Sequence, residues 1–282
     1  MIRSLLPFRL MGMKRDFLVM GSDSGRIVIL DYDSQKGRLV KIRQETFGKT
    51  GVRRTVPGDY LATDPKGRAI MIGAVEKQKF VYILNRDSQN NLTISSPLEA
   101  HKPHVITLDM VGMDVGIEHP QFACLEMDYG DIDSNNAAVN TGVVTKILTL
   151  YEMDLGLNHV IRKHINKVDA TAHKLVAVPG EPNGPSGIIV VCENFVVYKN
   201  VDHEDRKCYF PRRKRIMNYE EPIFITAAAT YGGKQFFFIL QSEQGDLYKV
   251  SLDHTEQMVH GLSIQFFDTV APGTALNIIP SG

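Results

Sequence analysis

The sequence predicts an all-β fold: an incomplete β-propeller built from four-stranded antiparallel blades. The first observation is a pair of stretches about 220 positions apart, residues 17–33 (FLVMGSDSGRIVILDYD) and 237–253 (FFILQSEQGDLYKVSLD). Each is an apolar run, a polar link that ends in glycine, and a second run that alternates apolar and polar residues. Gly25 and Gly245 occupy equivalent places, where a tight turn requires a positive φ that glycine adopts readily. Each stretch therefore predicts a β-hairpin, and its recurrence indicates a repeat architecture.

The second observation is that three more hairpins lie between these two. They are residues 68–84, residues 121–153 around the polar link 128–142, and residues 187–200. The five turns fall near positions 24, 77, 135, 193 and 244, about one every 55 residues. The offset between the first and last hairpins is therefore four periods.

The third observation is that strand-like segments flank every hairpin. They are residues 2–10 and 38–47, 59–62 and 91–95, 105–111 and 157–165, 175–178 and 207–210, and 223–229 and 262–267. Four antiparallel strands per period are typical of a propeller blade. The one helix-like alternative, residues 2–13, is interrupted by Pro7 and Gly12.

The predicted blades follow from these segments. We expect five blades of an anticipated seven, at residues 1–50, 51–102, 103–168, 169–215 and 216–268, with the first strand of a further blade in residues 269–282. The sequence contains no tryptophan, which separates it from the Trp-Asp and kelch propellers.

Composition limits the classes of partner. Lys plus Arg and Asp plus Glu both number 32, so no global field attracts nucleic acid or a membrane surface. Three cysteines give no disulfide framework and favour an intracellular, reducing setting. No apolar run approaches the roughly 18 residues that would cross a bilayer. The sequence therefore predicts no membrane partner.

No group of residues predicts an enzyme site. His101 and His104 flank a Lys-Pro pair without a carboxylate or thiol at ligand spacing, so we expect a solvated loop and no metal. Cys124 and Cys192 lie in apolar runs and are expected to be buried small side chains. The proline-rich residues 180–187 lead into no helix, which argues against a phosphate-binding loop. We therefore predict no catalytic residue, no cofactor and no small-molecule substrate.

The most strongly charged feature is a run of cations that follows the fourth blade. The candidate docking residues are Arg212, Arg213, Lys214 and Arg215, with Arg53 and Arg54 as a weaker pair. One interpretation is a solvated connection between blades. The others are a docking patch for an acidic partner or for RNA phosphates, or part of a nuclear import signal. Neither group has interleaved aromatic residues for base stacking, so sequence-specific RNA binding is not expected.

Longer segments resemble a known family. They include residues 44–87, FACLEMDYG at 122–130, PSGIIVVCENFVVYKN at 185–200 and FFFILQSEQGDLYKV at 236–250. These segments resemble the splicing factor 3b subunit 3 family, large subunits of the U2 small nuclear ribonucleoprotein, in the family's order along almost the whole chain. The departures are concentrated in loops such as residues 131–142. Relatives in the DNA-damage-binding and polyadenylation-specificity complexes share the fold but are less similar here.

The resemblance implies a three-propeller protein, of which this chain is part of the first propeller without its opening strands and closing blades. It implies a nuclear, non-catalytic scaffold of the splicing factor 3b complex that supports U2 particle assembly and branch-site engagement in pre-mRNA splicing. The implied partners are the helical-repeat and small subunits of that complex, with the U2 particle and pre-mRNA contacted indirectly. The alternative is a propeller adaptor in a ubiquitin-ligase or chromatin-modifying complex.

Overall fold

A computed structural model describes residues 1–47, 58–130, 145–201, 203–212, 221–232 and 235–279. These residues form strands, turns and loops and contain no helix, which confirms the predicted all-β class. Accordingly, none of them belongs to a helix long and apolar enough to cross a membrane. The chain divides into two compact units, Met1–Ala170 and Thr171–Gly282, and each is described by itself.

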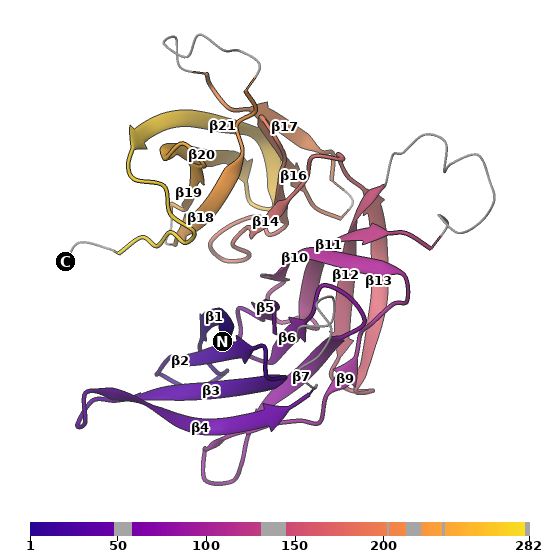
Figure 1. Cartoon of the computed structure of the whole chain (residues 1–282), viewed down its shortest axis with the longest axis vertical. Coiled ribbons are helices and arrows are strands. Elements are labelled where there is room, and N and C mark those ends of the chain that lie inside the picture. The colour runs from indigo at the N-terminus through magenta and orange to yellow at the C-terminus, as the bar shows by residue number, and fades with distance from the viewer. Residues whose placement is uncertain (48–57, 131–144, 202, 213–220, 233–234, 280–282) are drawn as a thin grey trace. The chain divides into compact units, whose positions relative to one another are not determined.

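The first unit holds three antiparallel sheets, in which strands adjacent in sequence are also neighbours in the sheet, except that both β8 and β9 pair with β7 (Figure 1). The first sheet is β1 (Ile2–Phe8), β2 (Phe17–Ser22), β3 (Arg26–Asp33) and β4 (Arg38–Thr46). The second is β5 (Tyr60–Thr63), β6 (Ala69–Gly73), β7 (Lys79–Arg86), β8 (Leu92–Ile94) and β9 (Leu98–Glu99). The third is β10 (Val105–Met113), β11 (Gln121–Asp128), β12 (Lys146–Asp154) and β13 (His159–Lys167).

The second unit holds two sheets with the same order of strands. The fourth sheet is β14 (Lys174–Ala177), β15 (Ile188–Val191), β16 (Phe195–Lys199) and β17 (Arg206–Tyr209). The fifth is β18 (Ile225–Tyr231), β19 (Phe237–Ser242), β20 (Asp246–Thr255) and β21 (Met258–Thr269). Each of the five sheets contains one of the predicted hairpins as its two middle strands.

The turn glycines have the backbone that the hairpin pattern requires. Gly25 and Gly245 have φ of 73° and 90°. At Gly245 the surroundings add a second constraint, because a Cβ atom there would lie 2.0 Å from the Val270 carbonyl oxygen. Glycine at this turn therefore serves both the left-handed backbone and a close approach of the chain.

The outer strand of the second sheet is divided in two. β8 pairs with the end of β7, whereas β9 pairs with its beginning. Pro97 lies between them and has no N–H to donate to a ladder. The Ser95 hydroxyl instead accepts the Ile83 N–H at 2.9 Å, which keeps the two pieces on the same neighbour.

The end of the chain is held by a side chain. The first strand of a further blade in residues 269–282 stays an expectation, since β21 runs to Thr269 and residues 270–279 pair with no strand among the described residues. The buried Gln241 side chain binds this segment instead. Its Nε2 donates to the Ala271 carbonyl and its Oε1 accepts the Gly273 N–H, both at 3.0 Å. A side chain rather than a neighbouring strand therefore satisfies these backbone groups.

The second sheet is buried on both faces because successive residues point in opposite directions. On one face Ile70, Ile72 and Tyr82 pack with residues of the first sheet. On the other, Met71 and Val81 pack with residues of the third. This explains why β6 is apolar at four consecutive positions, whereas a strand with one face exposed to solvent alternates apolar and polar residues.

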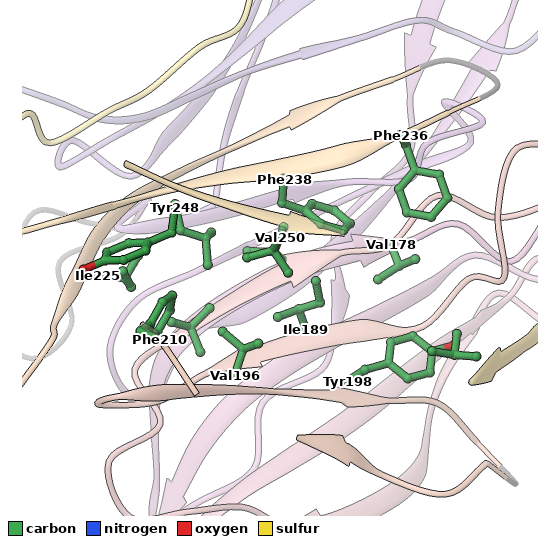
Figure 2. Packing of buried hydrophobic residues seen from close by; sticks show 14 residues of the cluster. Val178, Ile189, Val196, Tyr198, Phe210, Ile225, Phe236, Phe238, Tyr248 and Val250 are labelled. Atoms are coloured by element: carbon green, nitrogen blue, oxygen red, sulfur yellow. The ribbon is translucent and has the colours of Figure 1, made fainter. Parts of the chain in front are cut away.

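The second unit has its core between its two sheets. Figure 2 shows Ile189, Val196 and Tyr198 of the fourth sheet facing Phe238 and Val250 of the fifth. All five side chains are fully buried, so this interface contributes a large share of the hydrophobic stabilisation of the unit.

Candidate docking surface

Only part of the predicted basic site lies in the described residues. Arg212 is described, and it lies directly after the fourth sheet. Residues 53–54 and 213–215, which hold the other five predicted cations, lie outside the described residues.

Arg212 is exposed but is bound within the chain. Its Nη1 donates to the Glu221 carbonyl at 2.9 Å and its Nη2 to Asn194 Oδ1 at 2.8 Å. The same Asn194 oxygen accepts the Ile223 N–H at 2.9 Å. Arg212 therefore ties the turn between β15 and β16 to the segment that leads into β18. This is a positioning role that the sequence did not indicate.

Asn194 can hold this contact because of its backbone. It has φ of 70°, in the left-handed region that asparagine tolerates better than most residues. Its carbonyl also accepts the Phe210 N–H at 2.9 Å. Asn194 in the hairpin turn therefore binds Phe210 and Arg212 at the start of the basic run and Ile223 after it.

A cation and two aromatic rings lie on the outer part of the fourth sheet. Lys207 Nζ is 3.6 Å from the centroid of the Phe195 ring and 4.8 Å from that of Tyr209. The two ring centroids are 5.5 Å apart. Lys207 is exposed and Tyr209 is 64% exposed, so this arrangement is open to a partner. We call Phe195, Lys207, Tyr209 and Arg212 the β17 patch.

The β17 patch places aromatic rings beside the basic run, although none is interleaved with its cations. Lys207 and Tyr209 are two positions apart on β17, so both side chains point to the same face of the sheet. The sequence carried this signal, since Tyr209 lies three positions before Arg212. What it did not carry was Phe195, which reaches the same face from the neighbouring strand.

A buried polar cluster lies between the second and third sheets, and the sequence gave no indication of it. The Lys79 ammonium on β7 forms an ion pair with the Glu126 carboxylate on β11. Glu126 also accepts the Thr149 hydroxyl at 2.6 Å and the Tyr151 hydroxyl at 2.8 Å. Arg162 Nη2 lies 3.5 Å from the same carboxylate. Every ligand of the carboxylate is a hydrogen-bond donor, so the buried charge is satisfied.

The protonation states follow from this geometry. Burial opposes ionisation of Glu126, but the Lys79 charge and the donated hydrogen bonds outweigh it and lower the pKa of Glu126. Burial likewise disfavours the Lys79 cation, yet the neighbouring carboxylate raises the pKa of Lys79 above its ordinary value. Both groups are therefore charged at neutral pH. The cluster therefore holds the two sheets together through paired charges and donated hydrogen bonds.

The two histidines of the predicted loop do not converge on a metal. His101 is half-buried and desolvation lowers its pKa, whereas His104 packs edge-on against Tyr129 at 5.6 Å between ring centroids. Among the residues that the structure describes, no group of three or more His, Cys, Asp or Glu side chains could hold a metal ion.

Two of the three cysteines are buried, whereas Cys208 on β17 is half-buried. Cys124 and Cys192 are fully buried, as their apolar runs predicted. Burial raises the pKa of Cys124 to about 12. The reactive thiolate is therefore scarce at neutral pH.

Comparison with known families identifies the type of fold to which these five sheets belong. The sequence profile described as "RSE1/DDB1/CPSF1 first beta-propeller" matches residues 1–282. The chain belongs to this family. Because this family is a β-propeller, the five sheets of the chain are propeller blades, which confirms the predicted fold class. The buried pair of Lys79 and Glu126 joins two consecutive blades of this propeller.

Individual relatives of this propeller are similar over the whole chain. The chain is 50% identical over 284 residues to splicing factor 3B subunit 3 of Drosophila melanogaster and over 287 residues to that of Danio rerio. It is also 50% identical over 281 residues to spliceosome-associated protein 130 A of Arabidopsis thaliana. All of the chain is covered in each comparison, and it spans 23% of the length of these relatives.

Proposed function

We propose that the chain is a non-catalytic scaffold domain of the splicing factor 3b complex in the nucleus. In this proposal it supports U2 particle assembly and branch-site engagement through protein contacts with the helical-repeat and small subunits of that complex. The U2 particle and pre-mRNA are contacted indirectly. Each of the five sheets acts as one blade, with boundaries at residues 1–50, 51–102, 103–168, 169–215 and 216–268.

One observation carries this proposal: half of the residues are identical to proteins named splicing factor 3B subunit 3, over the full chain. The polar chemistry agrees with a scaffold. The buried Lys79 and the half-buried Arg162 both pair with the Glu126 carboxylate, so these charges stabilise blade packing.

Affinity purification of the full protein that contains this chain tests the assignment. We expect splicing factor 3b subunits by mass spectrometry and U2 RNA by hybridisation. Recovery of cullin or acetyltransferase subunits without U2 RNA would contradict it and would support the adaptor alternative.

We further propose that the β17 patch, extended by Arg213, Lys214 and Arg215, docks an acidic partner or RNA phosphates within that complex. Support comes from the exposed Lys207 and Tyr209 beside the start of the basic run. A cation next to an aromatic ring can bind a carboxylate or phosphate and stack on a planar group at once. The pair Arg53 and Arg54 stays a weaker prediction for the same role.

The structure determines which variants can test this docking role. Charge reversal at Arg212 would also remove its bonds to Asn194 and Glu221, so it cannot separate docking from folding. Reversal of Arg213, Lys214 and Arg215 together, with Arg212 retained, should reduce co-purified partners or RNA. The matched control is Lys36, Arg38 and Lys41 changed to Glu, three exposed cations of the β3–β4 hairpin. Unchanged co-purification by the triple variant would rule the role out.

A further inference from the structure

The first unit contains a pocket formed by three sheets. It has a volume of about 330 Å³. Leu10 and Met11 follow β1, Asn85 and Arg86 end β7, and Asn158 belongs to the turn between β12 and β13. The first and third strands of each sheet run in the same direction, so their ends meet at one edge of the sheets and can line a common pocket.

The wall of the pocket carries polar groups that are available to a ligand. The Arg86 guanidinium lies against the turn at Gly12, where an added Cβ would be 2.8 Å from Nη2. Arg86 and Asn85 are exposed, and neither side chain has an ion pair or hydrogen bond with the residues that the structure describes. The same holds for the Asn158 amide. A second lining guanidinium, Arg68, is already bound to the Asp64 carboxylate at 2.8 Å and to the Glu118 carbonyl. One guanidinium and two amides of the lining therefore have no intramolecular partner among the described residues.

The carboxylates nearest in sequence to the pocket are occupied elsewhere. Asp87 accepts the Gln89 and Asn91 N–H groups at 2.8 Å within its own turn. Asp154 accepts the N–H groups of Gly156 at 2.8 Å and Leu157 at 2.9 Å. These charges are held in their own turns, and no carboxylate in the part of the chain that the structure describes forms an ion pair with Arg86.

The floor of the pocket is apolar. Leu10 and Leu84 are nearly completely buried beneath it, and Met11 is 59% exposed at its rim. No aromatic residue lines the pocket. A nucleic acid gains affinity from several phosphate contacts and from stacking on aromatic rings, and this pocket supplies one unpaired guanidinium and no ring. A peptide matches the pocket better, because amide side chains can pair with its backbone and an aliphatic side chain can cover the floor.

We propose that this pocket binds an acidic peptide segment of a protein partner, in which a carboxylate pairs with Arg86 and an adjacent aliphatic side chain packs on Leu10, Met11 and Leu84. The segment's backbone pairs with the Asn85 and Asn158 amides. This site is separate from the β17 patch and does not depend on the splicing assignment.

Fluorescence anisotropy with the full chain tests the pocket. The probe is a fluorescein-labelled, end-blocked peptide of sequence Asp-Glu-Leu-Glu-Asp, titrated in 0.1 M salt. We expect saturable binding that Arg86→Gln weakens about tenfold or more, as for loss of a charge-assisted hydrogen bond. Met11→Glu should weaken binding comparably, since it places a competing carboxylate at the rim. Both positions are exposed, so neither change removes core packing.

The controls test separately the charge of Arg86, the apolar floor of the pocket and the chemical class of the ligand. Arg38→Gln, at an exposed arginine outside the pocket, should leave the affinity unchanged. The neutral peptide Asn-Gln-Leu-Gln-Asn and the peptide with Ser in place of Leu should both bind more weakly. Absence of saturable binding, or equal binding by the chain with Arg86→Gln, would overturn the proposal. Tighter, Arg86-dependent binding of a uridylate pentamer would overturn it in favour of a phosphate site.

Discussion

Lys79 on β7 and Glu126 on β11 form a buried ion pair that joins the second and third blades. The lysine side chain is 5% exposed and the carboxylate is completely buried. Charges removed from water this far are tolerated only when their partners are in place. Each side chain of the pair therefore needs the other in place, in addition to the apolar packing between the two blades.

Removing one member of this pair should be costly. We expect Glu126→Gln to reduce the free energy of unfolding by about 3–5 kcal/mol, because it leaves the Lys79 charge buried without its counterion. Urea unfolding followed by circular dichroism measures the change. The control is Asp16→Asn, which breaks the exposed pair with Arg9 and should leave the midpoint essentially unaltered. A similar loss in both variants would contradict the argument from burial.

Removing both charges should restore much of the stability. In the double variant Lys79→Met with Glu126→Leu, the buried Lys79 charge is removed together with its counterion, and only the partly exposed Arg162 loses a partner. Replacements of buried pairs by apolar residues are often neutral. We expect the double variant to be clearly more stable than Glu126→Gln alone, by the same measurement. A double variant as unstable as the single one would mean that the hydrogen bonds from Thr149 and Tyr151, rather than the charge, dominate.

The pair also predicts a dependence of stability on acid. The pKa of Glu126 is lowered in the folded chain, so its contribution is present above the ordinary carboxyl value of 4.5 and is lost as pH falls through the folded value. We expect the unfolding midpoint of the unaltered chain to fall more steeply below about pH 4.5 than that of Glu126→Gln. Parallel midpoints from pH 7 to pH 3 would show that other carboxylates account for acid sensitivity.

A comparison of Gly37 and Gly245, which both have positive φ, distinguishes the cost of backbone strain from the cost of a close contact. Gly37 has φ of 60° and nothing within 4 Å of an added Cβ, whereas at Gly245 that atom would meet the Val270 oxygen. We expect Gly37→Ala to cost about 1 kcal/mol from strain alone and Gly245→Ala more than about 3 kcal/mol. Thermal unfolding of the two variants compares them. Equal losses would indicate that residues 270–272 move away at little cost.

Asn194 should be important for the stability of the second unit. Asn194→Gly keeps a residue that accepts φ of 70° but removes the oxygen that binds Arg212 and Ile223. We expect a loss of about 1–3 kcal/mol, as for backbone and side-chain donors left without an acceptor. Arg212→Gln should lose less, since the Ile223 N–H keeps its partner. The reverse order, measured by urea unfolding, would contradict the assignment of Asn194 as the central acceptor.

Individual residues show which parts of the fold follow from local sequence. The hairpins around Gly25 and Gly245 were predictable because alternation along a strand and a positive φ at a turn are properties of a few neighbouring residues. The division of the second sheet's outer strand at Pro97 could also be predicted from the sequence, because proline has no N–H to donate to the neighbouring strand. The segment after Thr269 was predicted as a strand because it is apolar, but the side chain of Gln241 binds its backbone.

The candidate sites were less predictable for a physical reason. Lys207 and Tyr209 share a face by local alternation, but Phe195 reaches them from another strand. Arg86 and Asn158 line one pocket although they belong to different sheets.

The sequence alone determined the repeat of hairpins, the absence of a disulfide framework and the similarity to a splicing family, because each is a property of residue order. The tertiary structure decided that Lys79 meets Glu126 across 47 positions, that Arg212 binds Asn194 and that Arg86 forms no ion pair with a described carboxylate. Alternation along a strand tells which residues leave the sheet on the same side. What lies opposite them depends on how neighbouring sheets pack, and only the packed chain specifies that.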